Sequence, residues 1–168
     1  TAFLGSRMYH KGVRCADCHD FHSAKVRLPG NMLCLSCHGP GATNAPIINP
    51  VRHSHHKVFG FDTSGVLTNT DLSAYKPDRI KETGGECVNC HMPQTVYMQR
   101  HSRHDHGFTI PDPLLTKQFG IPNACNRCHT DRSTDWSLEH VEKWYGEKMN
   151  RTCSSNDSNR SLSFSIRS

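Results

Sequence analysis

Cys15-Ala16-Asp17-Cys18-His19 is the first of four stretches in which two residues separate a pair of cysteines and a histidine follows directly. The pattern recurs at residues 34–38, 87–91 and 125–129. Two thiols on one helical turn can each form a thioether with a vinyl group of haem, and the histidine that follows projects towards the iron as an axial ligand. The four repeats therefore predict four covalently bound haem c groups.

The motifs assign a role to each of their cysteines and histidines. The predicted thioether-forming residues are Cys15, Cys18, Cys34, Cys37, Cys87, Cys90, Cys125 and Cys128. The predicted proximal ligands of the irons are His19, His38, His91 and His129.

Two other uses of cysteine fit parts of this pattern. The first two pairs have the Cys-x2-Cys-x15-Cys-x2-Cys spacing of a zinc ribbon, whereas 34 residues separate the last two pairs. Disulfides would explain an even number of paired cysteines in an exported protein. Neither use requires a histidine after every pair, so the pattern favours haem.

Nine histidines remain after the four proximal ligands, which is more than four irons need. The surplus predicts bis-histidine ligation at every iron, which is typical of low-potential electron-transfer centres. The five methionines are interpreted as packing against the porphyrin faces. The candidate distal ligands are His10, His22, His55, His56 and His106.

Position along the chain limits what these candidates can reach. His22 follows His19 by three residues, so we expect it to serve a neighbouring haem. The adjacent His55 and His56 indicate one segment that serves two haems, and His10 could serve another haem or a neighbouring subunit. The remaining histidines are interpreted as surface residues or propionate partners; these are His53, His101, His104 and His140.

Composition predicts little regular structure. Only 35% of the residues are hydrophobic and 8% aromatic, too few for an ordinary aliphatic core. Pairs that interrupt helices and strands, such as Pro29-Gly30 and Asn49-Pro50, recur about every dozen residues. We expect a mostly irregular, loop-rich fold with short α-helices, little β-structure and a core filled by haem. One longer helix is predicted from about residue 134 to 145, with an apolar stripe of Trp136, Val141 and Trp144.

The chain divides by composition into two parts. Residues 1–149 form the predicted tetrahaem domain, and residues 150–168 form a polar tail rich in Ser and Asn. Within the tail, residues 161–166 alternate polar and apolar with the period of a strand. An isolated strand is unstable, so we expect this one to pair during assembly. Cys153, the ninth cysteine, is either a spare thiol or an intermolecular crosslink.

The charge does not indicate a nucleic-acid partner. The formal charge is +5, but the basic residues are scattered, and four haems would add roughly eight propionate charges. We therefore expect no nucleic-acid binding.

No apolar run is long enough to predict a membrane span. Some arginines are candidates to neutralise propionates, although each could equally be a solvated surface charge; these are Arg14, Arg52, Arg103 and Arg127.

From about residue 8 to residue 145 the sequence resembles a family of secreted bacterial multihaem cytochromes with doubled CxxCH motifs. The matching segments include residues 8–13 (MYHKGV), 18–23 (CHDFHS), 90–93 (CHMP), 103–108 (RHDHGF) and 122–125 (PNAC). The resemblance implies electron transfer. Because c-type haem is attached after export, it also implies a periplasmic or extracellular location, with the export signal already removed.

Four haems in a small chain are also similar in design to the subunits of polymeric cytochrome nanowires. This second resemblance implies a homo-polymer with a continuous chain of haems, in which a distal histidine can come from the next subunit. We therefore expect a subunit of an extracellular conductive filament, with other redox proteins or extracellular electron acceptors as partners. A discrete periplasmic shuttle is the alternative. A multihaem reductase of small oxyanions or nitrogen compounds is a third reading; because the histidine surplus can fill every iron, we expect no enzyme activity.

Overall fold

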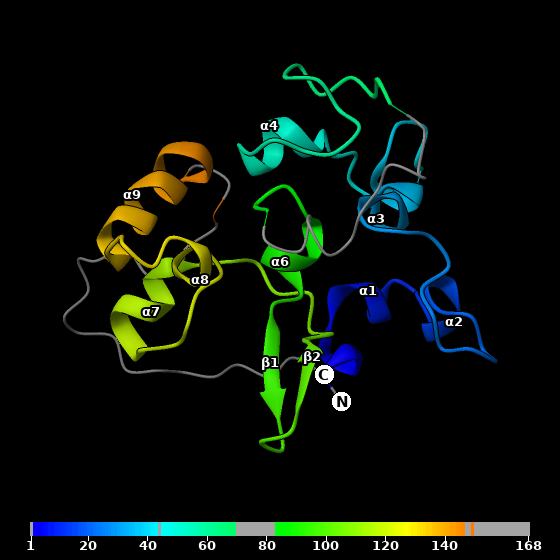
Figure 1. Cartoon of the computed structure of the whole chain (residues 1–168), viewed down its shortest axis with the longest axis horizontal. Helices are drawn as coiled ribbons and strands as arrows, with labels where there is room; N and C mark the ends of the chain where they lie inside the picture. Colours follow the sequence, from blue (N-terminus) through cyan, green and yellow to red (C-terminus); the bar gives the residue numbers. More distant parts are fainter. Residues whose placement is uncertain (1, 44, 70–82, 147–148, 150–168) are drawn as a thin grey trace, which may run out of the picture.

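Short helices joined by loops make up most of the structure (Figure 1). The computed structural model describes residues 2–43, 45–69, 83–146 and 149. In chain order the elements are the 3-10 helix η1 (Phe3–Gly5), α1 (Arg7–His10), α2 (Cys15–Cys18), α3 (Asn31–His38), α4 (Pro50–Ser54), α6 (Cys87–His91), β1 (Gln94–Tyr97), β2 (His101–His104), α7 (Pro113–Phe119), α8 (Cys125–Cys128) and α9 (Thr134–Tyr145). The prediction of a loop-rich fold with short helices is confirmed.

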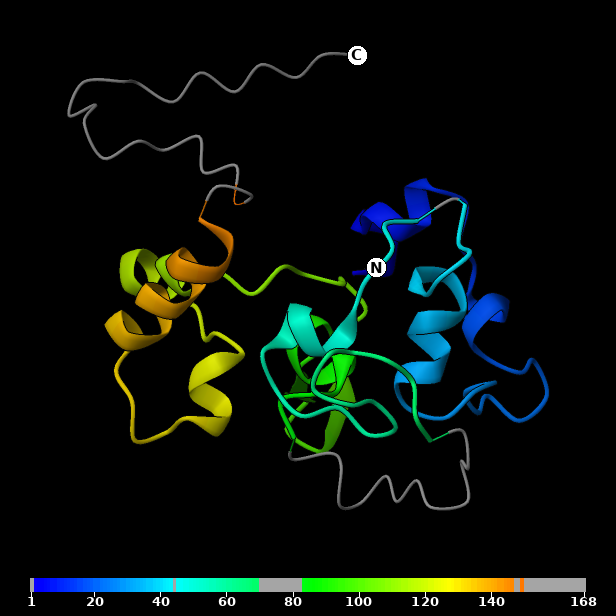
Figure 2. The ribbon, with the colours of Figure 1, turned by 90° about the horizontal axis from the view of Figure 1, so that it is seen from above.

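The four helices that carry the cysteine motifs follow one another across the molecule. Figures 1 and 2 show α2 and α3 towards one end, α6 in the middle and α8 towards the other end. The buried side chain of Asn31 joins the two central motifs: its Nδ2 donates to the Gly85 carbonyl (2.7 Å), and its Oδ1 accepts from the Cys87 N–H (2.8 Å). A contact between residues more than 50 positions apart therefore sets α3 beside α6.

Helix α9 has the bounds that its sequence predicts. The Ser133 hydroxyl caps it by accepting a hydrogen bond from the Trp136 N–H (3.2 Å). Val141, in the apolar stripe, is buried. An exposed ion pair between Lys117 and Asp135 (2.8 Å) links α7 to α9. Helix α9 also contacts α8, so it lies next to the last cysteine motif (Figure 2).

The strands β1 and β2 form an antiparallel hairpin, with Tyr97 paired to His101, and two isolated β-bridges lie elsewhere in the described residues. Its turn contains Met98 and Gln99 at positive φ angles of 49° and 60°. Little β-structure is expected from the sequence, and the structure agrees. The alternation in this segment is too weak to predict the hairpin itself.

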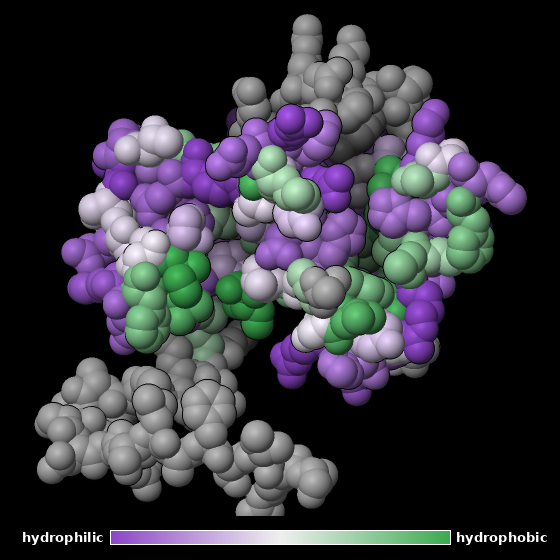
Figure 3. Space-filling view, turned by 90° about the horizontal axis from the view of Figure 1, so that it is seen from below, coloured by the Kyte–Doolittle hydropathy of each residue, from purple (hydrophilic) through white to green (hydrophobic). Residues whose placement is uncertain are grey.

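The polypeptide buries few apolar side chains of its own. Among the described residues only Val58 and Val141 are buried hydrophobic residues, whereas Phe21, Met98 and Phe119 are 84%, 75% and 70% exposed. Figure 3 shows apolar side chains in separate groups on the surface. A chain that covers so little of its apolar surface needs another apolar component, which agrees with the predicted haem-filled core.

Two other sequence predictions concern membrane contact and the tail. Within the described ranges, no helix is both long and apolar enough to cross a bilayer. The predicted tail of residues 150–168, with its strand at 161–166 and Cys153, lies outside the described residues.

Candidate haem-binding site

Each cysteine motif lies on a short helical turn. In α2, α3, α6 and α8 the two cysteines are three residues apart, a spacing that places side chains on one face of a helix. All eight of these cysteines are free, and each is exposed or half-buried. The turns therefore present the paired thiols that two thioether bonds to one porphyrin require.

Three of the imidazoles predicted to be proximal ligands are held by backbone carbonyls. Nδ1 of His19 donates to the Ala24 carbonyl (3.0 Å), Nδ1 of His38 to Pro46 (3.0 Å) and Nδ1 of His91 to Thr109 (2.9 Å). A proton on Nδ1 leaves the lone pair of Nε2 free for a metal, and such hydrogen bonds orient and strengthen imidazole ligands. Three of the four motif histidines therefore have the tautomer that iron ligation needs.

Three of the predicted proximal imidazoles lie close to a second imidazole. The ring centroids are 6.2 Å apart for His19 and His106, 5.9 Å for His91 and His53, and 6.1 Å for His129 and His56. A metal–imidazole bond is about 2.0 Å long and the ring centre lies about 1.1 Å behind the nitrogen, so two imidazoles on one iron have centroids about 6.2 Å apart. The three separations match the space needed for one iron in each pair.

The second imidazoles also have structural support. Nδ1 of His106 donates to the His104 carbonyl (2.9 Å), and Nδ1 of His56 donates to the Ser54 carbonyl. The ring of His56 lies directly against Gly84, where a Cβ atom would collide with it. A glycine is therefore required for the 83–86 segment to pass this close to His56.

The predicted distal candidates do not all take part in these pairs. His56 and His106 do, whereas His55 has a left-handed backbone (φ 57°) and stacks on Trp144 with centroids 4.1 Å apart. His53, interpreted from sequence as a surface residue or propionate partner, is the histidine that lies next to His91, with near-parallel rings. One segment does contribute two facing imidazoles, but they are separated by a helix end rather than adjacent.

His10 and His22 are both exposed, and neither ring faces a proximal imidazole in the described part of the chain. His10 contacts Tyr9, with centroids 5.7 Å apart. His104 uses both ring nitrogens, one towards the Met92 carbonyl (2.6 Å) and one towards the Gln94 amide (3.2 Å). Both ring nitrogens of His104 therefore have hydrogen-bond partners within residues 92–94.

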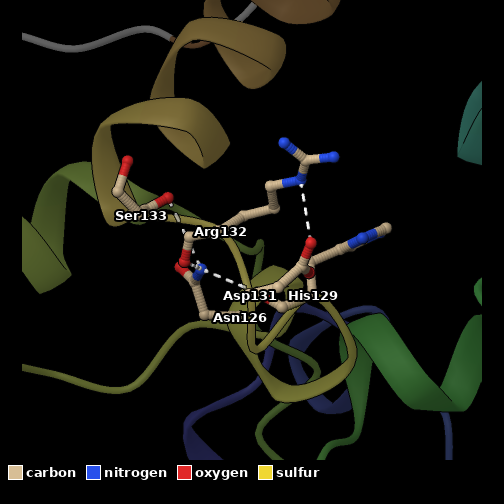
Figure 4. Close-up of polar contacts among 5 residues, drawn as sticks. All are labelled: Asn126, His129, Asp131, Arg132 and Ser133. Carbon is tan, nitrogen blue, oxygen red and sulfur yellow. Dashed lines mark hydrogen bonds and ion pairs between the residues drawn. The ribbon is translucent and has the colours of Figure 1, made fainter.

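The last motif is fixed by an asparagine inside it (Figure 4). Nδ2 of Asn126 donates to the carbonyl of Arg132 (2.9 Å) and approaches that of His129 (3.4 Å), and its Oδ1 accepts from the Ser137 hydroxyl (3.0 Å). The His129 ring lies 4.9 Å from that of Trp136. These contacts connect the proximal imidazole to α9, whose apolar stripe the sequence predicts to pack on a haem or on the core.

The thiols show that neighbouring motifs are also neighbours in space. Burial, followed by the nearby Cys34, raises the pKa of Cys18. A hydrogen bond between the Cys34 and Cys87 thiols lowers the pKa of Cys34 and raises that of Cys87. Burial, followed by the nearby Cys125, raises the pKa of Cys90 to about 11. The motifs therefore form one row in the order in which they occur in the chain.

The arginines considered for propionates have varied surroundings. Arg14 donates to the Tyr9 and Val13 carbonyls (3.3 and 3.0 Å), and Arg103 lies over the Tyr97 ring (5.1 Å). Arg52 and Arg127 are exposed. Pairing with propionates stays a prediction for all four.

A family model decides the class of the protein: the model for cytochrome c552 matches residues 73–167, more than half of the chain. The chain belongs to the cytochrome c552 family. It is a multihaem c-type cytochrome, and the donor set of paired thiols and facing imidazoles fits covalent haem c with its iron. The described residues contain no cluster of three or more His, Cys, Asp or Glu that could hold a bare metal ion. The family includes nitrite reductases, so membership does not decide between a carrier and an enzyme.

One solved structure gives the same fold assignment. The crystal structure of the outer cell wall cytochrome OcwA is similar to this cytochrome with a TM-score of 0.51 and 22% sequence identity. The similarity covers 81% of this chain but 27% of OcwA, so the chain spans about a quarter of that protein's length. No curated protein matches the sequence.

Proposed function

We propose that this cytochrome carries electrons along a row of four haem c groups, one at each cysteine motif. The observation that carries the proposal is the set of three facing imidazole pairs on a row of four attachment helices. The proposed thioether cysteines and proximal histidines are those of the four motifs. The proposed distal ligands are His106 for the iron of His19, His53 for that of His91 and His56 for that of His129.

Haem iron supplies the one-electron chemistry, because it alternates between the ferric and ferrous states. The protein sets the order of the row and the ligands. Asn31 holds the second motif against the third, and the carbonyl partners of His19, His38 and His91 fix their imidazoles. At the three irons with a proposed histidine pair, the two imidazoles would favour a low reduction potential and leave no position for a substrate.

The proposed location is outside the cytoplasm, in a periplasm or beyond the cell. Attachment of c-type haem after export supports it, and so does the similarity in fold to a protein described as an outer cell wall cytochrome. The proposed partners are other redox proteins or extracellular electron acceptors.

Within this function we propose a filament subunit, as the design of the sequence implies. The row of motifs runs from one end of the molecule towards the other (Figures 1 and 2). End-to-end copies would therefore lengthen the row, and a head-to-tail contact that does not close gives an open filament. Residues 1–149 would form the tetrahaem unit, and residues 150–168 would contribute to assembly.

A reductase is the second candidate, and one observation favours it. His38 faces no other histidine of the chain, although all thirteen histidines lie in the described part. The surplus of histidines therefore does not complete every iron within the chain, and the iron of His38 is the place where a substrate could bind.

The proposal can be tested on the native secreted protein by measuring the number of haems per chain and by imaging the particles with electron cryo-microscopy. Four haems per chain, and filaments with one continuous haem row, support the proposal. Four haems in discrete particles make the protein a shuttle. Fewer than four haems would contradict the assignment of the motifs. Turnover of nitrite or another small oxyanion by the reduced protein would favour the reductase.

A further inference from the structure

The segment that contributes His53 and His56 reverses direction between them. Helix α4 ends just before His55, which has a left-handed backbone with φ 57° and ψ 23°. Side chains three residues apart on a continuous helix lie on the same side of it, so without the reversal the two imidazoles would point the same way. The reversal therefore separates them, and one lies next to His91 while the other lies next to His129.

The ring of His55 packs against the end of α9. It stacks on the indole of Trp144, with centroids 4.1 Å apart and an angle of 11° between the ring planes. Tyr145 meets the same imidazole edge-on, at a centroid distance of 6.0 Å. A left-handed backbone is unfavourable for a residue that carries a side chain, and it persists where surrounding contacts hold it. The stack on Trp144 supplies such a contact.

Tyr145 shows that this contact lies at the junction of the third and fourth cysteine motifs. Its ring lies 5.6 Å from that of His53. Burial, followed by the nearby Cys90 and Cys125, raises the pKa of Tyr145. Cys90 belongs to the third motif and Cys125 to the fourth. The end of α9 therefore reaches both of the proposed haem sites that the segment with His53 and His56 serves.

The same helix also contacts the proximal side of the fourth site. The ring of Trp136 lies 4.9 Å from that of His129 and 4.3 Å from that of His140. The ring of His140 lies 5.4 Å from that of Trp144, and its Nδ1 donates to the Trp136 carbonyl (2.9 Å). Helix α9 therefore contacts the proximal histidine of the fourth site as well as the segment that brings the distal one.

We propose that Trp144 is a positioning residue for two successive irons of the row. By stacking on His55 it holds the left-handed backbone, and this backbone directs the two distal imidazoles to the third and fourth irons. The inference rests on the proposed four-haem function. One side chain that is itself no ligand would thus set the axial geometry on both sides of the electron step between the third and fourth haems.

The experiment uses the holoprotein with four covalent haems and records its low-spin iron signals by electron paramagnetic resonance. Residues beyond the ligands orient axial imidazoles, and the g values of a low-spin haem iron report that orientation. The signals of the third and fourth irons are those lost in His53→Ala and His56→Ala. Trp144→Ala should shift both of these signals and leave the others in place, whereas Trp144→Phe, which keeps a stacking ring, should shift neither. Phe119→Ala, which removes an exposed ring from α7, is the matched control and should match wild type.

Two variants of His55 test the backbone part of the inference and leave α9 intact. His55→Ala removes the stack but keeps a Cβ, so it should shift both signals. His55→Gly should shift neither, because glycine adopts a positive φ without support. These two variants also decide the question if Trp144→Ala fails to take up four haems.

Three results separate the inference from the proposed function. A shift of one signal alone, or of none, in a four-haem Trp144→Ala protein overturns the inference. Equal spectra for His55→Ala and His55→Gly overturn it as well, because the stack then does not act through the backbone. A haem count below four in the wild-type protein defeats the proposed function, whereas the first two results, with four haems attached, defeat this inference alone.

Discussion

Asn31 is the side chain on which the spacing of the two central motifs depends. In Asn31→Ala, the Gly85 carbonyl loses a short buried hydrogen bond and the Cys87 N–H loses a short part-buried one. A buried polar group left without its partner costs about 1–3 kcal/mol, so the two together should cost about 2–6 kcal/mol. For a chain of this size each kcal/mol lowers Tm by about 2–4 °C, which predicts a fall of about 4–24 °C.

Thermal unfolding of the holoprotein, followed by the haem absorbance band and by circular dichroism, measures this change. Gln118→Ala is the matched control, because it removes an exposed side-chain amide from α7. We expect it to change Tm by less than about 2 °C, as surface substitutions usually do. If Asn31→Ala unfolds with the control, within about 0.5 kcal/mol of wild type, Asn31 does not hold α3 to α6 and the reasoning is refuted.

The remaining predictions concern the facing imidazoles. Removing any one of the three proposed distal ligands should convert one iron from low-spin to high-spin in the electron paramagnetic resonance spectrum. His104→Ala is the control and should leave every iron unchanged, because both ring nitrogens of His104 have other hydrogen-bond partners. An additional high-spin iron in His104→Ala would contradict the assignment. The three variants are His53→Ala, His56→Ala and His106→Ala. Gly84→Ala should reproduce the spectrum of His56→Ala, since its Cβ would displace that imidazole, while Gly5→Ala, with open space at its Cβ, is the control and should match wild type. Equal spectra for the two glycine variants would show that Gly84 does not position His56.

The proposed attachment residues follow from sequence alone, because covalent chemistry fixes the spacing of the two cysteines and the histidine. His106 and His56 could be proposed because they lie in irregular segments near the motifs. The choice between His53 and His55 depends on where α4 ends: His55 takes a left-handed backbone there, and its ring turns to Trp144. Sequence patterns do not specify such a local reversal.

The order of the motifs in space could not be predicted from the sequence, for a different reason. It depends on contacts between distant residues, such as the hydrogen bonds from Asn31 to Gly85 and Cys87, which no local pattern reveals. The helix Thr134–Tyr145 shows the opposite case. Its cap at Ser133 and its apolar period are local, and its bounds could be predicted from that period.

The most direct test of the central claim is a high-resolution structure of the holoprotein with its haems, by electron cryo-microscopy or crystallography. We predict four haems in the order of the motifs along the chain, with His106, His53 and His56 as the sixth ligands of the irons held by His19, His91 and His129. A different order of haems, or irons in which these imidazoles are not paired, would contradict it.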